Sequence, residues 1–351
     1  MSRRTSIVIL NWNGRQLLEN FLPALVRNTP SDIAEIVVAD NGSSDDSVTF
    51  LEKNYPFIRL IKFNINYGFA GGYNRALSEI DNDYVILLNS DVEVTPDWLT
   101  APIEYLDANP DIVAVQPKIL SYNNKTRFEY AGAAGGYLDM YGYPFCRGRI
   151  FTRLEKDDGQ YNKPAEILWA SGACMFIRCK DYFECGGLDE YFFAHQEEID
   201  MCWRLRARGK KIVCLPQSTV YHVGGATLNT EHPQKTFLNF RNNLLLLYKN
   251  LPEQYFIRVF LFRFFADYLA ALRFLFKGRP VNAWAVVKAR WKFQRKKKDY
   301  REIRRTNMQK SVCQDLPNGI IKKSLLVNYS IIVSTPDFAI WENSFTFANN
   351  K

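Results

Sequence analysis

The chain has 351 residues, of which 47% are hydrophobic and 15% aromatic, and its formal net charge is +8. This composition is ample for one large folded domain, or for one domain with an appendage. Seven cysteines without a CxxC pair argue against a disulfide framework or a zinc site and predict reduced thiols in the cytoplasm. The positive charge indicates a polyanionic partner, which could be phosphates, nucleic acid or an anionic membrane surface.

The N-terminal third alternates between short apolar runs and segments with helical spacing. The opening run follows two arginines directly and is too short for a signal peptide. Three strands are predicted, at Ser6–Leu10, Glu35–Ala39 and Ile58–Phe63, with a helix at Arg15–Arg27 after the first. Short connections between strands and helices predict a doubly wound, mostly parallel α/β sheet.

A fourth strand, Tyr84–Leu88, is an unbroken apolar run of the kind found at the centre of a parallel sheet. It ends in Asn89, Ser90 and Asp91. Ligands of open α/β sheets bind at the carboxyl ends of the strands, and a carboxylate there suits a divalent cation with a diphosphate. The alternative is a polar strand end that caps the following turn.

A glycine-rich loop follows the third strand and contains Gly68, Gly71 and Gly72. Bare backbone N–H groups at a helix start could hold phosphates. The loop matches neither a Walker motif nor the dinucleotide-binding fingerprint, so a plain flexible turn is the alternative. Further along, strands are predicted at Ile112–Gln116 and Trp169–Ile177, and an irregular aromatic stretch at Phe128–Arg149 could frame a second substrate.

A second acidic group is Glu197, Glu198 and Asp200, in a helix expected to start near Gln196 or Glu197. Acidic side chains in a first turn favour the helix dipole, which is the structural explanation. Three crowded carboxylates exceed what capping requires, and crowding raises at least one carboxyl pKa, as a general base needs.

Two more candidates follow short strands predicted at Lys211–Leu215 and Ser218–Tyr221. His222 sits at a strand end beside glycines, where it could bind a metal ion or a pyrophosphate, or serve a structural role. Arg241, in an apolar helix predicted at Phe237–Leu251, suits a phosphate or an ion pair with one of the acidic residues.

Taken together, these motifs resemble the family 2 glycosyltransferases of the GT-A fold, in particular their bacterial rhamnosyltransferase-like branch. The matching segments are SIVILNWNG, VVADNGSSDDS, NYGFAGGYNRAL, LLNSDVEV, SGACMFI, GGLDEYFFAHQEEIDMCWR, VYHVGG and FRNN. Their order and spacing are more specific than any one of them. The resemblance implies a Rossmann-like GT-A catalytic domain over residues 1–250.

The resemblance also implies roles for the candidate residues. Asp40 would hydrogen-bond the nucleoside base, and Arg241 would contact the leaving diphosphate. Asp91 and His222 would bind Mg²⁺ or Mn²⁺, with Asn89 standing where the family's metal motif usually has its first Asp. Glu198 would be the general base, a Glu where the family usually has Asp, with Glu197 and Asp200 in reserve. The donor site would further include Asn11, Trp12, Asn13, Gly71, Gly72, Asn89 and Ser90.

The implied activity is inverting, metal-dependent transfer of a sugar to a glycan or lipid-linked acceptor in cell-surface polysaccharide synthesis. The favoured donor is dTDP-rhamnose. A UDP-sugar donor (galactofuranosyl or hexosyl) and a non-catalytic nucleotide-binding protein are the alternatives. Asn89 and Glu198 keep the second alternative open. The sequence predicts neither the acceptor and its linkage nor the oligomeric state.

The basic excess lies in the C-terminal third. Arg258, Arg263, Asp267 and Arg273 interrupt the apolar run Tyr255–Phe276, and each would cost about 2.5–3.5 kcal/mol at the bilayer centre. The run therefore predicts a helix that lies in the membrane interface or packs on the catalytic domain.

Residues 251–310 as a whole are expected to form basic amphipathic helices. These would bind the anionic inner face of the cell membrane, in preference to nucleic acid. The alternative is a solvated basic helix. Residues 311–351 form an extension without an assigned role, with a strand expected at Leu325–Val333.

Overall fold

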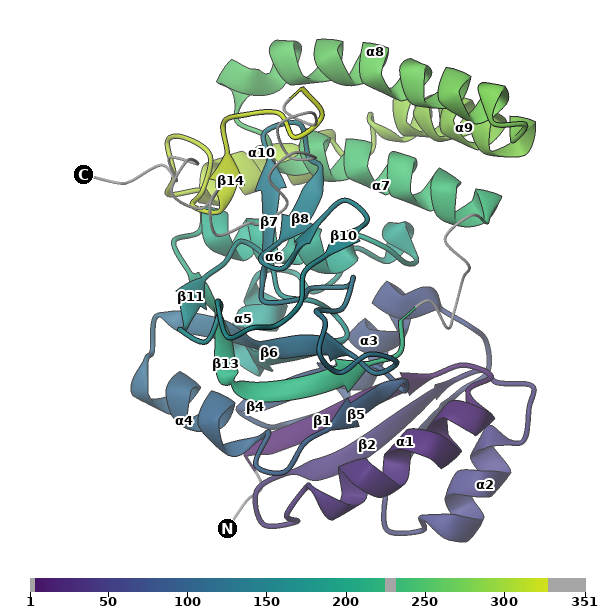
Figure 1. Ribbon diagram of the computed structural model, residues 1–351, viewed down its shortest axis with the longest axis vertical. Helices are drawn as coiled ribbons and strands as arrows, with labels where there is room; N and C mark the ends of the chain where they lie inside the picture. The colour runs from purple at the N-terminus through teal and green to yellow at the C-terminus, as the bar shows by residue number, and fades with distance from the viewer. Residues whose placement is uncertain (1–3, 225–231, 328–351) are drawn as a thin grey trace.

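The computed structural model describes residues 4–224 and 232–327, and a large mixed β-sheet forms its centre (Figure 1). A short strand, β5 (Val92–Val94), pairs with one end of β13. The other strands, in spatial order, are β11 (Ala165–Glu166), β13 (Lys211–His222), β6 (Ile112–Ser121), β12 (Cys174–Arg178), β4 (Tyr84–Leu88), β1 (Thr5–Asn11), β2 (Glu35–Asn41) and β3 (Arg59–Phe63).

The predicted mostly parallel sheet is confirmed, with β12 as an exception near its centre. β1 pairs in parallel with β2 and β4, and β6 pairs in parallel with β13. β12 lies antiparallel to both β4 and β6, with Cys174 opposite Leu88 and Arg178 opposite Tyr84. The chain therefore enters β12 from the edge where its neighbours end, which brings residues just before Cys174 to that edge.

Helices cover both faces of the sheet (Figure 1). Ile7 and Ile9 of β1 contribute to the core under α1, α2 and α4, whereas Val8 contributes to the core under α3, α5 and α6. This alternation explains the unbroken apolar strands, because each successive side chain meets a covered face. These helices are α1 (Arg15–Arg27), α2 (Ser47–Asn54), α3 (Gly68–Ser78), α4 (Thr100–Ala108), α5 (Cys179–Glu184) and α6 (Glu197–Ala207).

The two short strands predicted before His222 form one continuous strand, β13. Its register against β6 shifts between Leu215 and Thr219, and Pro216, which has no N–H to donate, lies inside that shift. The sequence therefore showed a break where the structure has an irregularity within one strand. Similarly, the strand predicted to end at Gln116 continues to Ser121.

The irregular stretch forms a small second sheet above the first. Its strands, in spatial order, are β10 (Arg153–Leu154), β9 (Arg149–Ile150), β8 (Pro144–Cys146), β7 (Gly136–Asp139) and β14 (Ile320–Ile321). β14 comes from the C-terminal extension and pairs in parallel with β7. The described part of that extension thus packs on the domain that contains the central sheet. Of the strand expected at Leu325–Val333, the first three residues form a turn and the others lie outside the described residues.

Four helices follow β13: α7 (Pro233–Asn250), α8 (Glu253–Phe276), α9 (Pro280–Lys296) and α10 (Arg301–Lys310). Val259 of α8 and Phe293 of α9 belong to the same hydrophobic core as the face of the sheet under α3. These helices are therefore built onto the domain that contains the central sheet rather than attached by a linker. Within residues 4–224 and 232–327, no helix has the length and hydropathy needed to cross a bilayer.

Candidate active site

The loops after β1 and β2 are joined by hydrogen bonds at the carboxyl edge of the sheet. Asn11 Nδ2 donates to Asp40 Oδ1 at 3.0 Å, and the Ser43 N–H donates to Asp40 Oδ2 at 3.0 Å. Asn13 accepts from the Ser44 N–H at 2.7 Å. Asn11 and Asp40 are buried, whereas Trp12 is half exposed. The predicted nucleoside-binding residues therefore form one rigid group with an exposed aromatic side chain beside it.

Asp91 and His222 come together because β5 pairs with the end of β13. The register places Val92 opposite His222, and the Val223 N–H donates to the Asp91 carbonyl at 3.1 Å. Asp91 Oδ1 lies 3.1 Å from His222 Nε2, and Asn89 Nδ2 lies 3.4 Å from the same nitrogen. Two predicted residues that follow β4, Asn89 and Asp91, thus lie beside the imidazole nitrogen of a third, His222, which is distant in the sequence.

Glu129, which sequence reasoning did not single out, lies on the other side of His222. Its Oε2 is 3.2 Å from His222 Nδ1, an ion-pair distance without the direction of a good hydrogen bond. Burial lowers the pKa of His222, but Asp91 and Glu129 outweigh burial and raise it to about 10. As the structure stands, the imidazole is therefore protonated between two buried carboxylates.

The side chains of Asp91 and His222 are suitable ligands for a divalent cation. No group of three or more His, Cys, Asp or Glu side chains in the described ranges forms a complete metal site. Asp91 Oδ1 and His222 Nε2 nevertheless converge, and together they offer one hard oxygen and one imidazole nitrogen. Glu129 contacts the far ring nitrogen, as carboxylates behind metal-bound histidines do. The residues present fit an ion whose remaining ligands come from a diphosphate.

Glu197 and Glu198 open helix α6 without partners for part of their carboxylates. Each has a buried Oε2 atom that accepts no hydrogen bond from the described residues. Burial raises the pKa of Glu198 to about 7, despite backbone N–H groups that favour its charged form. Burial and the neighbouring Glu198 carboxylate raise the pKa of Glu197 as well. The pKa of Glu198 therefore lies near neutral pH, where its unprotonated form is available to accept a proton, as a general base requires.

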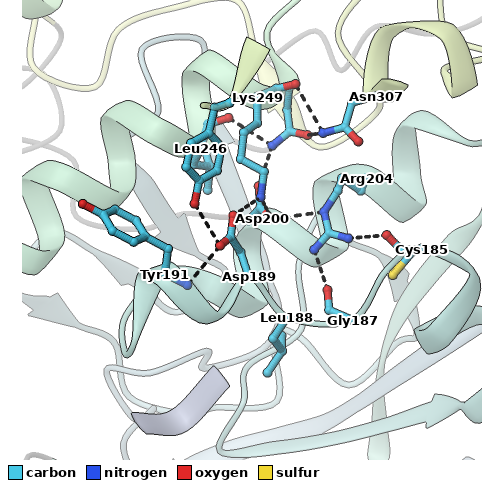
Figure 2. Close-up of polar contacts among 12 residues, drawn as sticks. Cys185, Gly187, Leu188, Asp189, Tyr191, Asp200, Arg204, Leu246, Lys249 and Asn307 are labelled. Atoms are coloured by element: carbon cyan, nitrogen blue, oxygen red, sulfur yellow. Dashed lines mark hydrogen bonds and ion pairs between the residues drawn. The ribbon is translucent and has the colours of Figure 1, made fainter. Parts of the chain in front are cut away.

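Asp200, one turn further along α6, is fully engaged (Figure 2). It accepts from Lys249 Nζ at 2.7 Å, from Asn250 Nδ2 at 2.8 Å and from Arg204 Nε at 3.1 Å. Burial by itself raises the pKa of Asp200, but Lys249 and Arg204 outweigh it and lower the pKa. This carboxylate ties α6 to α7 and holds no proton at neutral pH, so the structure gives it a structural role.

Helix α7 holds the loop that leads into Glu197. Asn242 Nδ2 donates to the carbonyls of Phe192, Ala194 and His195 at 3.0, 2.9 and 2.8 Å. Arg241 Nη2 donates to the Tyr191 and Phe192 carbonyls at 2.8 and 3.0 Å.

The Arg241 side chain was expected to contact the donor diphosphate. In the structure its Nη2 donors position the loop before the glutamates, and the diphosphate contact stays a prediction. The clamp matters because Phe193, His195 and Gln196 all have positive φ, a costly conformation for residues other than glycine.

Gly72, one of the glycines predicted to hold phosphates, has a packing role in this structure. A Cβ on Gly72 would lie 2.7 Å from the Leu10 side chain, so glycine lets α3 approach β1 closely. The first N–H groups of α3 are also engaged, since Phe69 N donates to the Phe193 carbonyl at 2.7 Å. The loop that carries the acidic pair thus packs on the start of α3, and a phosphate contact at Gly71 and Gly72 stays a prediction.

That same contact places Glu197 and Glu198 at the edge where the other candidates lie. Helix α3 begins just beyond the carboxyl end of β3, and Asn41 at the end of β2 donates to the Gly68 carbonyl at 3.0 Å. The loop ending at Gln196 packs on this helix start. Nucleoside candidates, metal candidates and the acidic pair therefore share the carboxyl edge of one sheet, where open α/β sheets bind ligands.

Comparison with known proteins agrees with this arrangement. Residues 6–184, just over half of the chain, match the sequence profile of "Glycosyl transferase family 2". The chain belongs to this family. The crystal structure of GalNAc-T7 with UDP, GalNAc and Mn²⁺ superposes with a TM-score of 0.62 at 14% identity. It covers 98% of this glycosyltransferase, which spans 58% of that chain, and it supports the GT-A fold.

Two curated relatives of this glycosyltransferase carry rhamnosyltransferase names. The N-acetylglucosaminyl-diphospho-decaprenol L-rhamnosyltransferase of Mycobacterium tuberculosis is 26% identical over 231 residues, covering 62% of this chain and 75% of that protein. The rhamnosyltransferase WbbL of Escherichia coli K12 is 24% identical over 249 residues, covering 67% of this chain and 89% of that protein.

Two functional contacts of this glycosyltransferase escaped sequence reasoning. Glu129 lies in the stretch whose lack of periodicity gave no strand end or helix face to place it on. Asn242 lies beside Arg241 in the FRNN segment, but only the fold shows that its amide faces three carbonyls of a distant loop. A short polar pair within an otherwise apolar helix was the available signal for Asn242.

Proposed function

We propose that this glycosyltransferase inverts the anomeric configuration of its sugar and depends on a divalent metal ion. Its donor would be a nucleotide-diphosphate sugar, with dTDP-L-rhamnose favoured, and its acceptor a hydroxyl of a glycan or lipid-linked saccharide in cell-surface polysaccharide synthesis. The proposal rests on the acidic pair at the start of α6, where each glutamate has a buried Oε2 atom without a partner among the described residues, while Asp200 beside them is saturated.

In this mechanism Glu198 takes the proton from the acceptor hydroxyl. The acceptor oxygen then forms a bond to the anomeric carbon while the bond from that carbon to the diphosphate oxygen breaks on the opposite face. The nucleoside diphosphate departs with the electron pair. A pKa of about 7 suits this base, because the unprotonated form is available at neutral pH and still binds a proton well. Glu197, whose pKa is also raised by burial and by the Glu198 carboxylate, is the alternative base.

Asp91 and His222 would hold the divalent cation, which when bound neutralises negative charge on the departing diphosphate. Asn89, 3.4 Å from His222 Nε2, would orient the imidazole or contact the diphosphate through its amide. Asp40, Asn11 and Asn13 would bind the nucleoside, with the exposed Trp12 ring beside it. The choice of L-rhamnose is supported by the names of the two relatives in M. tuberculosis and E. coli.

We also propose that the enzyme works in the cytoplasm at the anionic inner face of the cell membrane, where lipid-linked acceptors reside. The M. tuberculosis relative is named for a decaprenol-linked saccharide, which supports such an acceptor. The basic and aromatic composition of residues 251–310 supports the location.

Donor choice can be tested by the thermal shift that each nucleotide sugar produces with and without Mn²⁺ or Mg²⁺. We expect the largest metal-dependent stabilisation from dTDP-L-rhamnose, and a transfer product of inverted anomeric configuration by NMR. A shift produced by UDP-sugars alone would overturn the donor assignment. Donor binding without turnover on any acceptor would instead favour a non-catalytic nucleotide-binding protein.

Asp91→Ala should weaken metal-dependent donor binding, because it removes the carboxylate that converges with His222. Calorimetric titration with donor, at several metal concentrations, measures the effect. The matched control is Asp111→Ala, which removes an exposed carboxylate paired with Lys211 beside the amino end of β6. Equal donor affinity in both variants, with unchanged turnover, would remove Asp91 from the site.

A further inference from the structure

Helix α8 buries two of its charged side chains and exposes most of its large apolar ones, which is unusual for a surface helix. Arg263 and Asp267 are 2% and 0% exposed and lie 3.0 Å apart. Arg290 of α9 reaches the same carboxylate at 2.5 Å. These charges were expected to keep the segment out of a bilayer, but the fold turns two of them inward and pairs them.

The outward face of α8 is lined by large apolar side chains. Nine such residues in this one helix are exposed, and their spacing of three and four residues places them along one side: Ile257, Leu261, Phe264, Phe265, Tyr268, Leu269, Leu272, Leu275 and Phe276. A helix of 24 residues is about 36 Å long. Figure 1 shows α8 as the outermost helix, on the side away from the central sheet.

A hydrophobic groove continues this face onto α9. Its volume is about 420 Å³, and its lining includes Leu272 and Leu275 from α8 with Ala283 and Trp284 from α9. Trp284 remains 65% exposed although it borders the groove. An exposed apolar surface of this extent marks an interaction site.

Basic side chains near the ends of α8 identify the partner by charge. Arg258 is exposed near one end, and Arg273 and Lys277 are exposed near the other. In a second copy of the chain these groups would meet like charges, whereas anionic lipid headgroups would neutralise them. Long basic side chains at such positions can reach the headgroups while the apolar face lies deeper.

We infer that the outward face of α8 inserts into one leaflet of an anionic membrane, with the helix lying in the membrane plane. This inference deepens the membrane location proposed above. Because vesicle binding requires no sugar transfer, it can fail while the proposed reaction holds, and the reverse is equally true.

Insertion of the apolar face of α8 is a different mode of membrane binding from electrostatic attraction between anionic lipids and the basic residues of 283–305. Arg290 is buried in the ion pair with Asp267, and Arg304 donates to the Tyr248 and Leu251 carbonyls at 2.7 and 2.8 Å. These two charges hold the helices together and are not free to bind lipid. Salt should therefore weaken membrane binding without abolishing it, since salt screens charges but leaves apolar burial intact.

The test is cosedimentation of the full chain with vesicles of phosphatidylcholine, with and without phosphatidylglycerol, at about 0.1 M and about 1 M salt. We expect binding to be strongest with phosphatidylglycerol and partly retained at high salt. Phe265→Ser with Leu269→Ser should lower the partition coefficient at least about tenfold. Brominated acyl chains should quench tryptophan fluorescence in the wild type, and less in Trp284→Phe.

A matched control is Phe57→Ser, because Phe57 is 68% exposed on the catalytic domain and Phe265 is 65% exposed. Melting temperatures should show that each variant folds. Three results would overturn the inference: no vesicle binding, complete release at high salt without acyl-chain quenching, or a loss in Phe57→Ser equal to that in the double variant Phe265→Ser with Leu269→Ser. A wild-type dimer that dissociates in the α8 variant would also overturn it, by assigning the face to a second copy.

Discussion

Two adjacent groups of carboxylates on α6 have the same chemistry and opposite surroundings. Glu197 and Glu198 have buried oxygens without partners in the described part of the chain, and their pKa values are raised. Asp200 is fully buried but accepts hydrogen bonds from Lys249, Arg204 and Asn250, and its pKa is lowered. Burial alone therefore does not make a carboxylate reactive. The positively charged partners around a carboxyl group decide whether it keeps a proton or, as a carboxylate, holds two helices together.

The Asp200 group extends beyond α6. Lys249 Nζ also contacts Asp189 at 2.6 Å, and the Tyr300 hydroxyl from the segment after α9 donates to Asp189 at 3.0 Å. Arg204 Nη2 donates to the Gly187 carbonyl at 2.6 Å. The network thus fixes the segments before and after the Glu197–Glu198 pair (Figure 2). We infer that Asp189 and Asp200, whose carboxylates have several partners, hold the surrounding segments in place. The unpartnered oxygens of Glu197 and Glu198 can then stay available to a substrate.

Among the substitutions that test this difference between the carboxylates of α6, the largest expected effect is on catalysis. Glu198→Gln removes the proton acceptor while preserving shape, and turnover should fall by about 10²–10⁴-fold, the range typical of a lost general base. Donor affinity should change little, because the role assigned to Glu198 concerns the acceptor hydroxyl. Steady-state rates and donor titration measure the two quantities. Glu197→Gln is the matched comparison. If it alone abolishes turnover and Glu198→Gln does not, the base is Glu197.

The next largest effect is on stability. Lys249→Met leaves two buried carboxylates without their shared cation, and breaking a buried ion pair from one side costs about 3–5 kcal/mol. The free energy of unfolding in urea measures the loss. A variant as stable as the wild type would show that the network is dispensable and that other contacts hold α6 in place.

The sequence predicted the fold and identified the three carboxylates of α6, but it did not predict which of them has a structural role. Tyr84–Leu88 is a strand with the predicted boundaries, and α6 begins at the predicted Glu197, because periodicity and capping act locally. The pairing of Asp200 with Lys249 joins residues 49 positions apart, so no local pattern could reveal it. The residues alone therefore did not distinguish the three carboxylates, the family resemblance favoured Glu198, and tertiary contacts set Asp200 apart.

The same limit explains the reassigned residues elsewhere. Gly72 was predicted from composition to face phosphates, and only the approach of Leu10 shows its packing role. Arg263 and Asp267 counted as charges in an apolar run, and only the docking of α9 shows that both face inward. In each case the residue type was informative, but the direction of the side chain depended on an element distant in the sequence.

The pH dependence of stability should differ in sign between the two groups. The folded pKa of Glu198 is raised from 4.5 to about 7, so its favourable contribution is complete below pH 4.5 and is lost as the pH rises to about 7. The folded pKa of Asp200 is lowered from 3.8, so its contribution is present above pH 3.8 and is lost as the pH falls through the folded value.

Melting curves of Glu198→Gln and Asp200→Asn between acid and neutral pH check both signs. Relative to the wild type, Glu198→Gln should gain stability as the pH rises from 4.5 to 7, since only the wild type titrates there. The deficit of Asp200→Asn should be largest at neutral pH and should shrink in acid. If the stabilities of the two variants, relative to the wild type, changed with pH in the same direction, the opposite surroundings inferred for Glu198 and Asp200 would be contradicted.

The smallest effect comes from an exposed ion pair that serves as the control for burial. Lys156 and Asp158 lie 2.8 Å apart, close to the separations at Lys249, but their side chains are 60% and 65% exposed. Lys156→Met should change the free energy of unfolding by about 0.2–1 kcal/mol, because water already solvates both charges. The same urea experiment compares it with Lys249→Met. A loss at Lys156 as large as that at Lys249 would mean that charge pairing alone, and not burial with several partners, accounts for the stability of the α6 network.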